Sequence, residues 1–224
     1  MKSAALLSIL SFLMASSPLL FAADAPHDFG KWEKEITAFE SADRTNPPPT
    51  NALLFVGSST IRFWTTLATD FSGYKIINRG FGGSEIADST HFAARIIFPY
   101  APHAIFFRAG GNDIADGKAP EAVFADFKEF VETVHAKLPA TEIFYISWSH
   151  TPARWKNRDK EDTLNNSVEA YARALPYVKF IETGAMVLAA DGQPRAELFR
   201  EDRMHFNAAG YKLLAERVRP FLPK

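Results

Sequence analysis

Two serines stand side by side where the chain leaves a short apolar run, in Val56-Gly57-Ser58-Ser59. A serine hydroxyl becomes a nucleophile when a neighbouring base takes its proton, and backbone N–H groups at the start of a helix can bind the oxyanion that forms. Gly57 allows a tight turn, and a helix is expected to begin at the serines. Taken alone, this segment is more typical of a turn with a helix N-cap.

An acid and a base that could activate such a serine occur near the C-terminus, in Asp202-Arg203-Met204-His205. In a turn before a helix, the carboxylate can accept a hydrogen bond from one imidazole nitrogen. This fixes the tautomer and leaves the other nitrogen free to take a proton from a serine. A surface turn is the alternative, and a metal site is disfavoured because no second histidine lies nearby at ligand spacing.

Two glycine-containing segments could bind an oxyanion. Residues 78–84 carry three glycines in four positions, so their backbone N–H groups can come close to a ligand. Gly110-Gly111-Asn112-Asp113 places an asparagine amide after a strand, where it could donate to a carbonyl oxygen under attack. Ordinary turns are the alternative for each segment. The four segments together supply every part needed for acyl transfer, which is much stronger than any one alone.

The elements that must position these residues alternate between short apolar runs and longer amphipathic ones. Five runs are apolar on both faces, as strands covered on both sides must be; they are 53–56, 75–78, 104–108, 142–147 and 178–181. The spacing predicts helices over 29–42, 84–98, 119–138, 160–174 and 208–221, the last capped by Asn207. This alternation predicts a parallel sheet with helices on both faces and an active site at the carboxyl ends of the strands.

The first residues are typical of a secretory signal peptide. Lys2 precedes a nearly unbroken apolar run over residues 4–21, and small residues follow. A membrane anchor is the alternative, but Pro18 and the lack of basic residues after the run disfavour it. We therefore expect residues 1–23 to be a signal peptide and 24–224 to be one hydrolase domain, secreted or periplasmic and not inserted in the membrane after cleavage.

Composition limits the remaining classes. The 224 residues are 47% hydrophobic with a net charge of −1, which suits a single domain and disfavours a nucleic-acid partner. Cysteine is absent, which excludes disulfides, thiolate catalysis and thiolate metal sites. No metal or organic cofactor is implied, and the oligomeric state is left open.

The four segments, in this order, resemble the four blocks of the SGNH hydrolases, also called the GDSL lipase/esterase family, over nearly the whole chain after residue 23. The resemblance implies an α/β fold, a flavodoxin-like three-layer α/β/α sandwich with a five-stranded parallel sheet. It assigns the nucleophile to Ser59, the base to His205 and the orienting acid to Asp202. It also implies an oxyanion hole made by the N–H groups of Ser59 and Gly83 and the amide of Asn112.

One position departs from the family pattern. Ser58 stands where the family usually has an aspartate, which makes Ser58 a rival nucleophile, although block position favours Ser59. The aspartate of the family is not the triad acid, so its absence need not abolish activity.

The resemblance implies hydrolysis of a small-molecule or polysaccharide ester through an acyl-enzyme. The loops hold no long apolar lid, and many secreted relatives remove acetyl groups from polysaccharides, so we expect a short-chain, carbohydrate-directed esterase. The alternatives are a lipase or lysophospholipase and a non-catalytic glycan-binding protein. Several side chains in or near the loops are candidates for substrate contact, with core or rim packing an equal alternative: Arg62, Arg79, Arg108, Arg154, Trp64, Trp148 and Trp155.

Overall fold

The computed structural model describes residues 27–223, so the predicted signal peptide lies outside the described residues. A five-stranded parallel sheet forms the centre, in the order β2-β1-β3-β4-β5. This order is that of flavodoxin-like folds, and the predicted fold class is confirmed. The strands are β1 (Leu53–Gly57), β2 (Ile76–Gly80), β3 (Ala104–Arg108), β4 (Glu142–Ile146) and β5 (Val178–Ile181).

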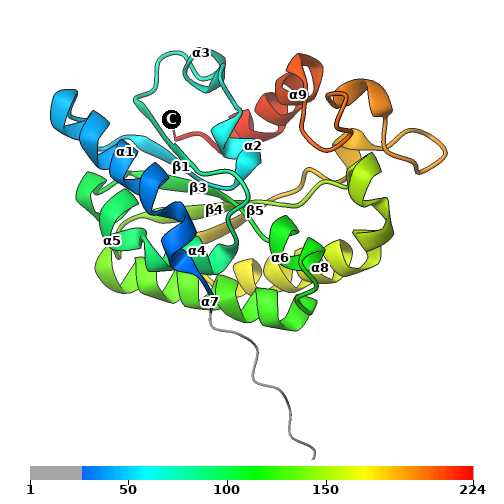
Figure 1. Cartoon of the computed structure of the whole chain (residues 1–224), viewed down its shortest axis with the longest axis horizontal. Coiled ribbons are helices and arrows are strands. Elements are labelled where there is room, and N and C mark those ends of the chain that lie inside the picture. The colour runs from blue at the N-terminus through cyan, green and yellow to red at the C-terminus, as the bar shows by residue number, and fades with distance from the viewer. Residues whose placement is uncertain (1–26, 224) are drawn as a thin grey trace, which may run out of the picture.

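Helices cover both faces of the sheet (Figure 1). One face carries α1 (Glu33–Thr45), α4 (Ile86–His91), α5 (Ala93–Ile96), α7 (Pro120–Lys137) and α8 (Arg158–Ala174). The other carries α2 (Ser59–Arg62), α3 (Leu67–Asp70) and α9 (Ala208–Val218). The short helix α6 (Gly111–Ala115) follows β3 directly, and two 3-10 helices matter below, η1 (Phe29–Trp32) and η3 (Pro152–Asn157). Among residues 27–223, no helix has the length and apolar character that crossing a bilayer requires.

Alternation along the strands builds two separate cores, one on each face. In β1, Leu54 and Val56 pack with α7 and α8, whereas Phe55 packs with α9. The ring of Phe55 stacks on Phe106 of β3, and Phe106 stacks on Phe144 of β4, at centroid distances of 4.7 and 4.8 Å. Each buried side chain of this size contributes about 1.5–3 kcal/mol. The three central strands are therefore fixed relative to one another, and so are the loops at their ends.

A glycine ends β1 because no other residue fits there. Gly57 has φ +139°, and a β-carbon on it would lie 2.0 Å from the carbonyl oxygen of Arg108 in β3. That same oxygen accepts a hydrogen bond from the N–H of Ser58, at 3.1 Å. The chain can thus turn tightly against β3 and begin α2 at Ser59.

The helix predicted over 84–98 is wrong in one respect, because it is broken. Phe92 has ψ 5° and leaves the helical region, so α4 ends at His91 and α5 begins at Ala93. The Phe92 ring is buried, where it makes an edge contact with Phe81. At the C-terminus, the predicted cap is confirmed: Asn207 accepts hydrogen bonds from the N–H groups of Ala209 and Gly210.

Candidate active site

The carboxyl ends of β1, β2 and β3 meet at one edge of the sheet. Gly57 pairs with Gly80 of β2 on one side and with Arg108 of β3 on the other. The serine segment, the glycine segment and the Gly-Gly-Asn-Asp segment all leave the sheet from these three positions. Parallel pairing therefore brings together three segments that are far apart in the sequence.

Three side chains form a hydrogen-bonded chain at this edge. His205 Nε2 lies 2.9 Å from the Oγ of Ser59, at the start of α2. On the other side of the ring, His205 Nδ1 lies 2.7 Å from Asp202 Oδ2. The second oxygen of Asp202 accepts the N–H groups of Met204 and His205, both at 2.9 Å. The geometry is that of a nucleophile, a base and an orienting acid.

The carboxylate of Asp202 is held ionised. Partial burial alone would raise its pKa, but hydrogen bonds from the backbone and ring of His205 and from the N–H of Met204 outweigh burial and lower the pKa to about 2. An ionised Asp202 requires a hydrogen on His205 Nδ1. The Nε2 atom that faces Ser59 is therefore free to accept a proton.

Ser58 and Ser59 have different surroundings. Ser58 is 1% exposed and is the N-cap of α2, and its carbonyl oxygen accepts the N–H of Ile61. Ser59 is the serine whose Oγ lies within hydrogen-bond distance of His205. Among the described residues, no hydrogen bond joins the hydroxyl of Ser58 to the imidazole.

The glycine segment lies against the serine. A β-carbon on Gly82 would be 3.8 Å from Ser59 Cβ, and the next residue, Gly83, has φ +84° and is exposed. The carbonyl of Ser84 accepts a hydrogen bond from the amide Nδ2 of Asn112, at 2.9 Å. The two segments predicted to supply oxyanion donors are thus joined directly, next to Ser59.

A small pocket opens beside Ser59 and His205, with an empty volume of ≈ 280 Å³. Its wall contains two cations, Arg108 and Arg154, and the indole of Trp148. Arg108 is buried beneath the site, and burial lowers the pKa of its guanidinium to about 10. A second hollow behind Phe63 is larger, at ≈ 890 Å³. The space next to the serine suits a small group.

Several side chains singled out as substrate contacts serve the fold instead. Trp64 is 1% exposed, and its indole N–H donates to Asp70 at 2.7 Å. Arg79 is buried and pairs with Asp43. Trp155 lies outside the pocket wall, where it packs against His150.

One aromatic residue at the candidate site, Trp32, was not predicted to lie there. A β-carbon on Gly83 would lie 3.1 Å from its ring, so the indole from η1 lies against one side of the glycine segment. Its place within residues 29–42 predicted only that it belongs to an N-terminal helix. A contact between segments fifty residues apart carries no local signal in the sequence.

Asp113, next to Asn112, is fully buried, which penalises its charge. Its Oδ1 accepts the N–H of Ile86 at 3.2 Å, and Lys118 Nζ is 3.9 Å away. Burial and the nearby carboxylate of Glu85 raise the pKa of Asp113 to about 7. Because this folded-state pKa lies above the unfolded value, the native state binds the proton more tightly. Stability is therefore lost as the pH rises toward 7.

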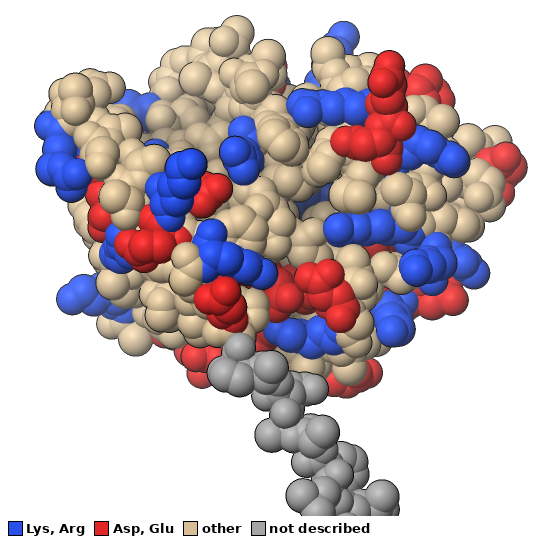
Figure 2. All heavy atoms as spheres, in the orientation of Figure 1, with Lys and Arg blue, Asp and Glu red and all other residues tan. Residues whose placement is uncertain are grey.

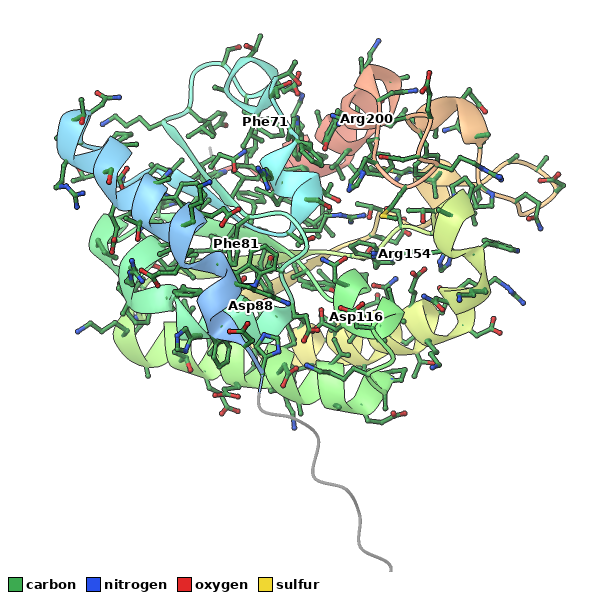
Figure 3. All side chains as sticks on the ribbon, viewed as in Figure 1. Phe71, Phe81, Asp88, Asp116, Arg154 and Arg200 are labelled. Carbon is green, nitrogen blue, oxygen red and sulfur yellow. The ribbon has the colours of Figure 1, made fainter. Side chains whose placement is uncertain are left out.

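We expect Asp113→Asn to become more stable relative to the wild type as the pH rises. The amide keeps an oxygen for Ile86 and cannot ionise, so its advantage should grow by about 1–3 kcal/mol between pH 5 and pH 8. Urea unfolding of both proteins across this range measures the difference. Asp116→Asn, at an exposed position one turn away, is the control (Figure 3). An advantage that does not change with pH would contradict the burial of a titrating group.

Figure 2 shows Lys and Arg interspersed with Asp and Glu over the face drawn there. Lysines and arginines clustered along one stripe, as nucleic-acid backbones require, are not visible on that face.

Comparison with known proteins identifies the family of the chain. The sequence pattern of the GDSL-like Lipase/Acylhydrolase family matches residues 54–213. The chain belongs to this family. Membership makes it an enzyme that hydrolyses ester bonds. No curated protein sequence matches the chain.

Solved structures share the fold at low sequence identity. A Streptococcus pneumoniae protein named for platelet activating factor is 20% identical, with a TM-score of 0.78 over 87% of this chain and 94% of that one. A GDSL-like lipase of Bacteroides thetaiotaomicron is 18% identical, with a TM-score of 0.72 over 87% and 98%. An acetylxylan esterase of Geobacillus stearothermophilus is 15% identical, with a TM-score of 0.63 over 78% and 96%.

Proposed function

We propose that the chain is a serine esterase that removes short acyl groups, acetyl above all, from carbohydrate esters. The observation that carries the chemistry is the continuous hydrogen-bonded chain Ser59–His205–Asp202, at 2.9 and 2.7 Å, beside a small pocket. His205 takes the proton of Ser59 as the Oγ attacks the acyl carbon. The alcohol then leaves with that proton, and water releases the acid by the same route in reverse.

The oxyanion of each tetrahedral intermediate would be held by three donors. These are the N–H groups of Ser59 and Gly83 and the free N–H of the Asn112 amide. Ser59 begins α2, so its N–H is unsatisfied by the helix. The amide of Asn112 is held next to this point by Ser84. Fixed donors of this kind typically contribute about 3–4 kcal/mol each to the transition state.

Pocket size supports the short acyl group. The space that a water-sized group can reach is ≈ 10 Å³ beside Ser59 and His205, against ≈ 490 Å³ in the hollow behind Phe63. So narrow an opening favours a small acyl group over a long chain, which would have to extend out of it. The carbohydrate part of the proposal rests on family resemblance and on the fold shared with an acetylxylan esterase.

An acyl-length series tests this proposal. With p-nitrophenyl esters, we expect kcat/KM to fall at least about tenfold from acetate to octanoate, because the longer chain does not fit the narrow space beside Ser59 and His205. Release of acetate from acetylated xylan, compared with hydrolysis of a lysophospholipid, then separates a carbohydrate esterase from a lipase. Faster octanoate hydrolysis would favour the lipase. A fluorophosphonate probe that fails to label the protein would favour the glycan-binding alternative.

We also propose that residues 1–23 direct export and are then removed. Their order of one basic residue, an apolar run and small residues supports this. Edman sequencing of protein recovered from the periplasm or the medium should begin close to residue 24. Protein that keeps Met1 and stays in the cytoplasm would refute it.

A further inference from the structure

The side-chain amide of Asn112 can help an oxyanion only if its nitrogen faces the reacting carbonyl. An asparagine can turn its amide over, which exchanges the nitrogen and the oxygen. In the flipped state, the oxygen would face the developing negative charge and repel it. Something must therefore hold the amide in one orientation.

Two partners at opposite ends of the amide do this. The guanidinium of Arg154 donates to Asn112 Oδ1 at 3.0 Å, and Nδ2 donates to the carbonyl of Ser84 at 2.9 Å. The second guanidinium nitrogen donates to the carbonyl of Gly111, also at 3.0 Å. A flipped amide would place an NH₂ group against a cation and a carbonyl against a carbonyl. Only the orientation with Nδ2 toward the glycine segment satisfies both partners.

The charge of Arg154 is also available to polarise the amide. Among residues 27–223, no carboxylate lies within ion-pair distance of its guanidinium. A cation at the amide oxygen draws electrons from the nitrogen, so the free N–H becomes a stronger donor. Only one of the two Nδ2 hydrogens is used by Ser84, and the other remains for a substrate oxygen.

Arg154 is itself held by the segment that carries it. In η3, its backbone N–H donates to the carbonyl and the hydroxyl of Thr151, at 3.1 and 3.3 Å. The neighbouring N–H of Ala153 donates to the carbonyl of Arg203, between Asp202 and His205, at 3.0 Å. Figure 3 shows Arg154 reaching from this segment toward the middle of the molecule. The short helix η3 thus contacts both the loop that carries Asp202 and His205 and the side-chain amide of Asn112.

We propose that Arg154 is a positioning residue, which fixes and polarises the Asn112 amide as an oxyanion donor. The inference rests on the proposed ester hydrolysis. Arg154 need not touch the substrate, so its loss should reduce kcat and leave KM nearly unchanged. Its effect should also depend on Asn112 being present.

A double-mutant cycle on p-nitrophenyl acetate tests this dependence. The variants are Arg154→Met, which keeps the apolar stem, Arg154→Lys, which keeps the charge, Asn112→Ala and the double variant Asn112→Ala/Arg154→Met. Arg158→Met is the matched control, because Arg158 is a nearby cation that packs on Trp155 instead. We expect Arg154→Met to lower kcat by about 10–100-fold, and Arg154→Lys to fall between it and the wild type.

The possible outcomes distinguish a wrong role for Arg154 from a wrong proposed function. In the Asn112→Ala background, Arg154→Met should add less than about a threefold loss. A full additional loss, or an unchanged kcat in Arg154→Met beside an active control, would overturn the inference alone. A wild type without turnover would overturn the proposed function instead.

NMR signals of the Asn112 side-chain amide test the role of Arg154 without a measurement of turnover. They also provide a test if one of the variants is unstable. The side-chain amide signals of Asn112 are identified by their absence in Asn112→Ala. In Arg154→Met, both amide proton signals should move, and Arg154→Lys should move them less. Signals that stay in place in folded Arg154→Met would overturn the role of Arg154. Arg154→Lys serves as the folded comparison where Arg154→Met unfolds.

Discussion

Ser59→Ala is expected to lower the turnover of p-nitrophenyl acetate by about 10⁶-fold, and His205→Ala by a similar factor. The two residues act as one unit, so removing either removes the whole acylation route. Steady-state kinetics with the purified variants provides the measurement. Fluorophosphonate labelling should disappear in Ser59→Ala at the same time.

Ser58→Ala is the matched control for this experiment, since it removes the adjacent hydroxyl. The Ser58 side chain makes no capping hydrogen bond to α2, so activity should stay within about tenfold of the wild type. Loss of labelling in Ser58→Ala with retention in Ser59→Ala would instead make Ser58 the nucleophile. Normal turnover in His205→Ala would remove the base from the mechanism.

Asp202→Asn should cost about 10⁴-fold in kcat while leaving the fold intact. The asparagine oxygen can still accept the N–H groups of Met204 and His205. Its NH₂ group, however, would donate to Nδ1 of His205, which forces the ring hydrogen onto Nε2. The imidazole then presents a hydrogen to Ser59 and cannot take its proton.

Glu201→Gln is the control for the loss of charge, because this adjacent carboxylate is exposed and outside the triad. It should leave kcat within about twofold. The low pKa of Asp202, about 2, adds a condition on pH. Asp202 should stay ionised throughout the range in which the enzyme is folded, so the Asn variant should be impaired at every pH tested. Recovery at neutral or higher pH would contradict the role of Asp202 in setting the tautomer.

The parts of the fold that could be predicted are those with strong local patterns. The five strands are apolar on both faces, and the structure confirms them. The cap at Asn207 depends only on the N–H groups of the next residues, and it is confirmed as well. The break at Phe92 could not be predicted. It depends on where the ring of Phe92 packs, which is decided by residues of other elements.

The candidate site likewise contains residues that could be predicted and residues that could not. Ser59, Asp202, His205, Gly83 and Asn112 could be proposed from the sequence, because their four segments resemble the family's blocks in the same order. The roles of the residues that contact and position them could not be predicted. Arg154 was predicted only as a candidate for substrate contact, and Trp32 only as part of an N-terminal helix, because the tertiary fold decides which way these side chains point.

The indole of Trp32 next to Gly83 brings a residue from outside the family-matched region to the candidate site. The family pattern begins at residue 54, at the first strand, yet the wall of the glycine segment comes from residue 32. A shortened protein that begins at residue 53 would keep all five strands and the side chains of Ser59, Asp202 and His205. It would nevertheless lose the indole that lies against Gly83, so expression and fusion designs should keep the helix that begins at Phe29.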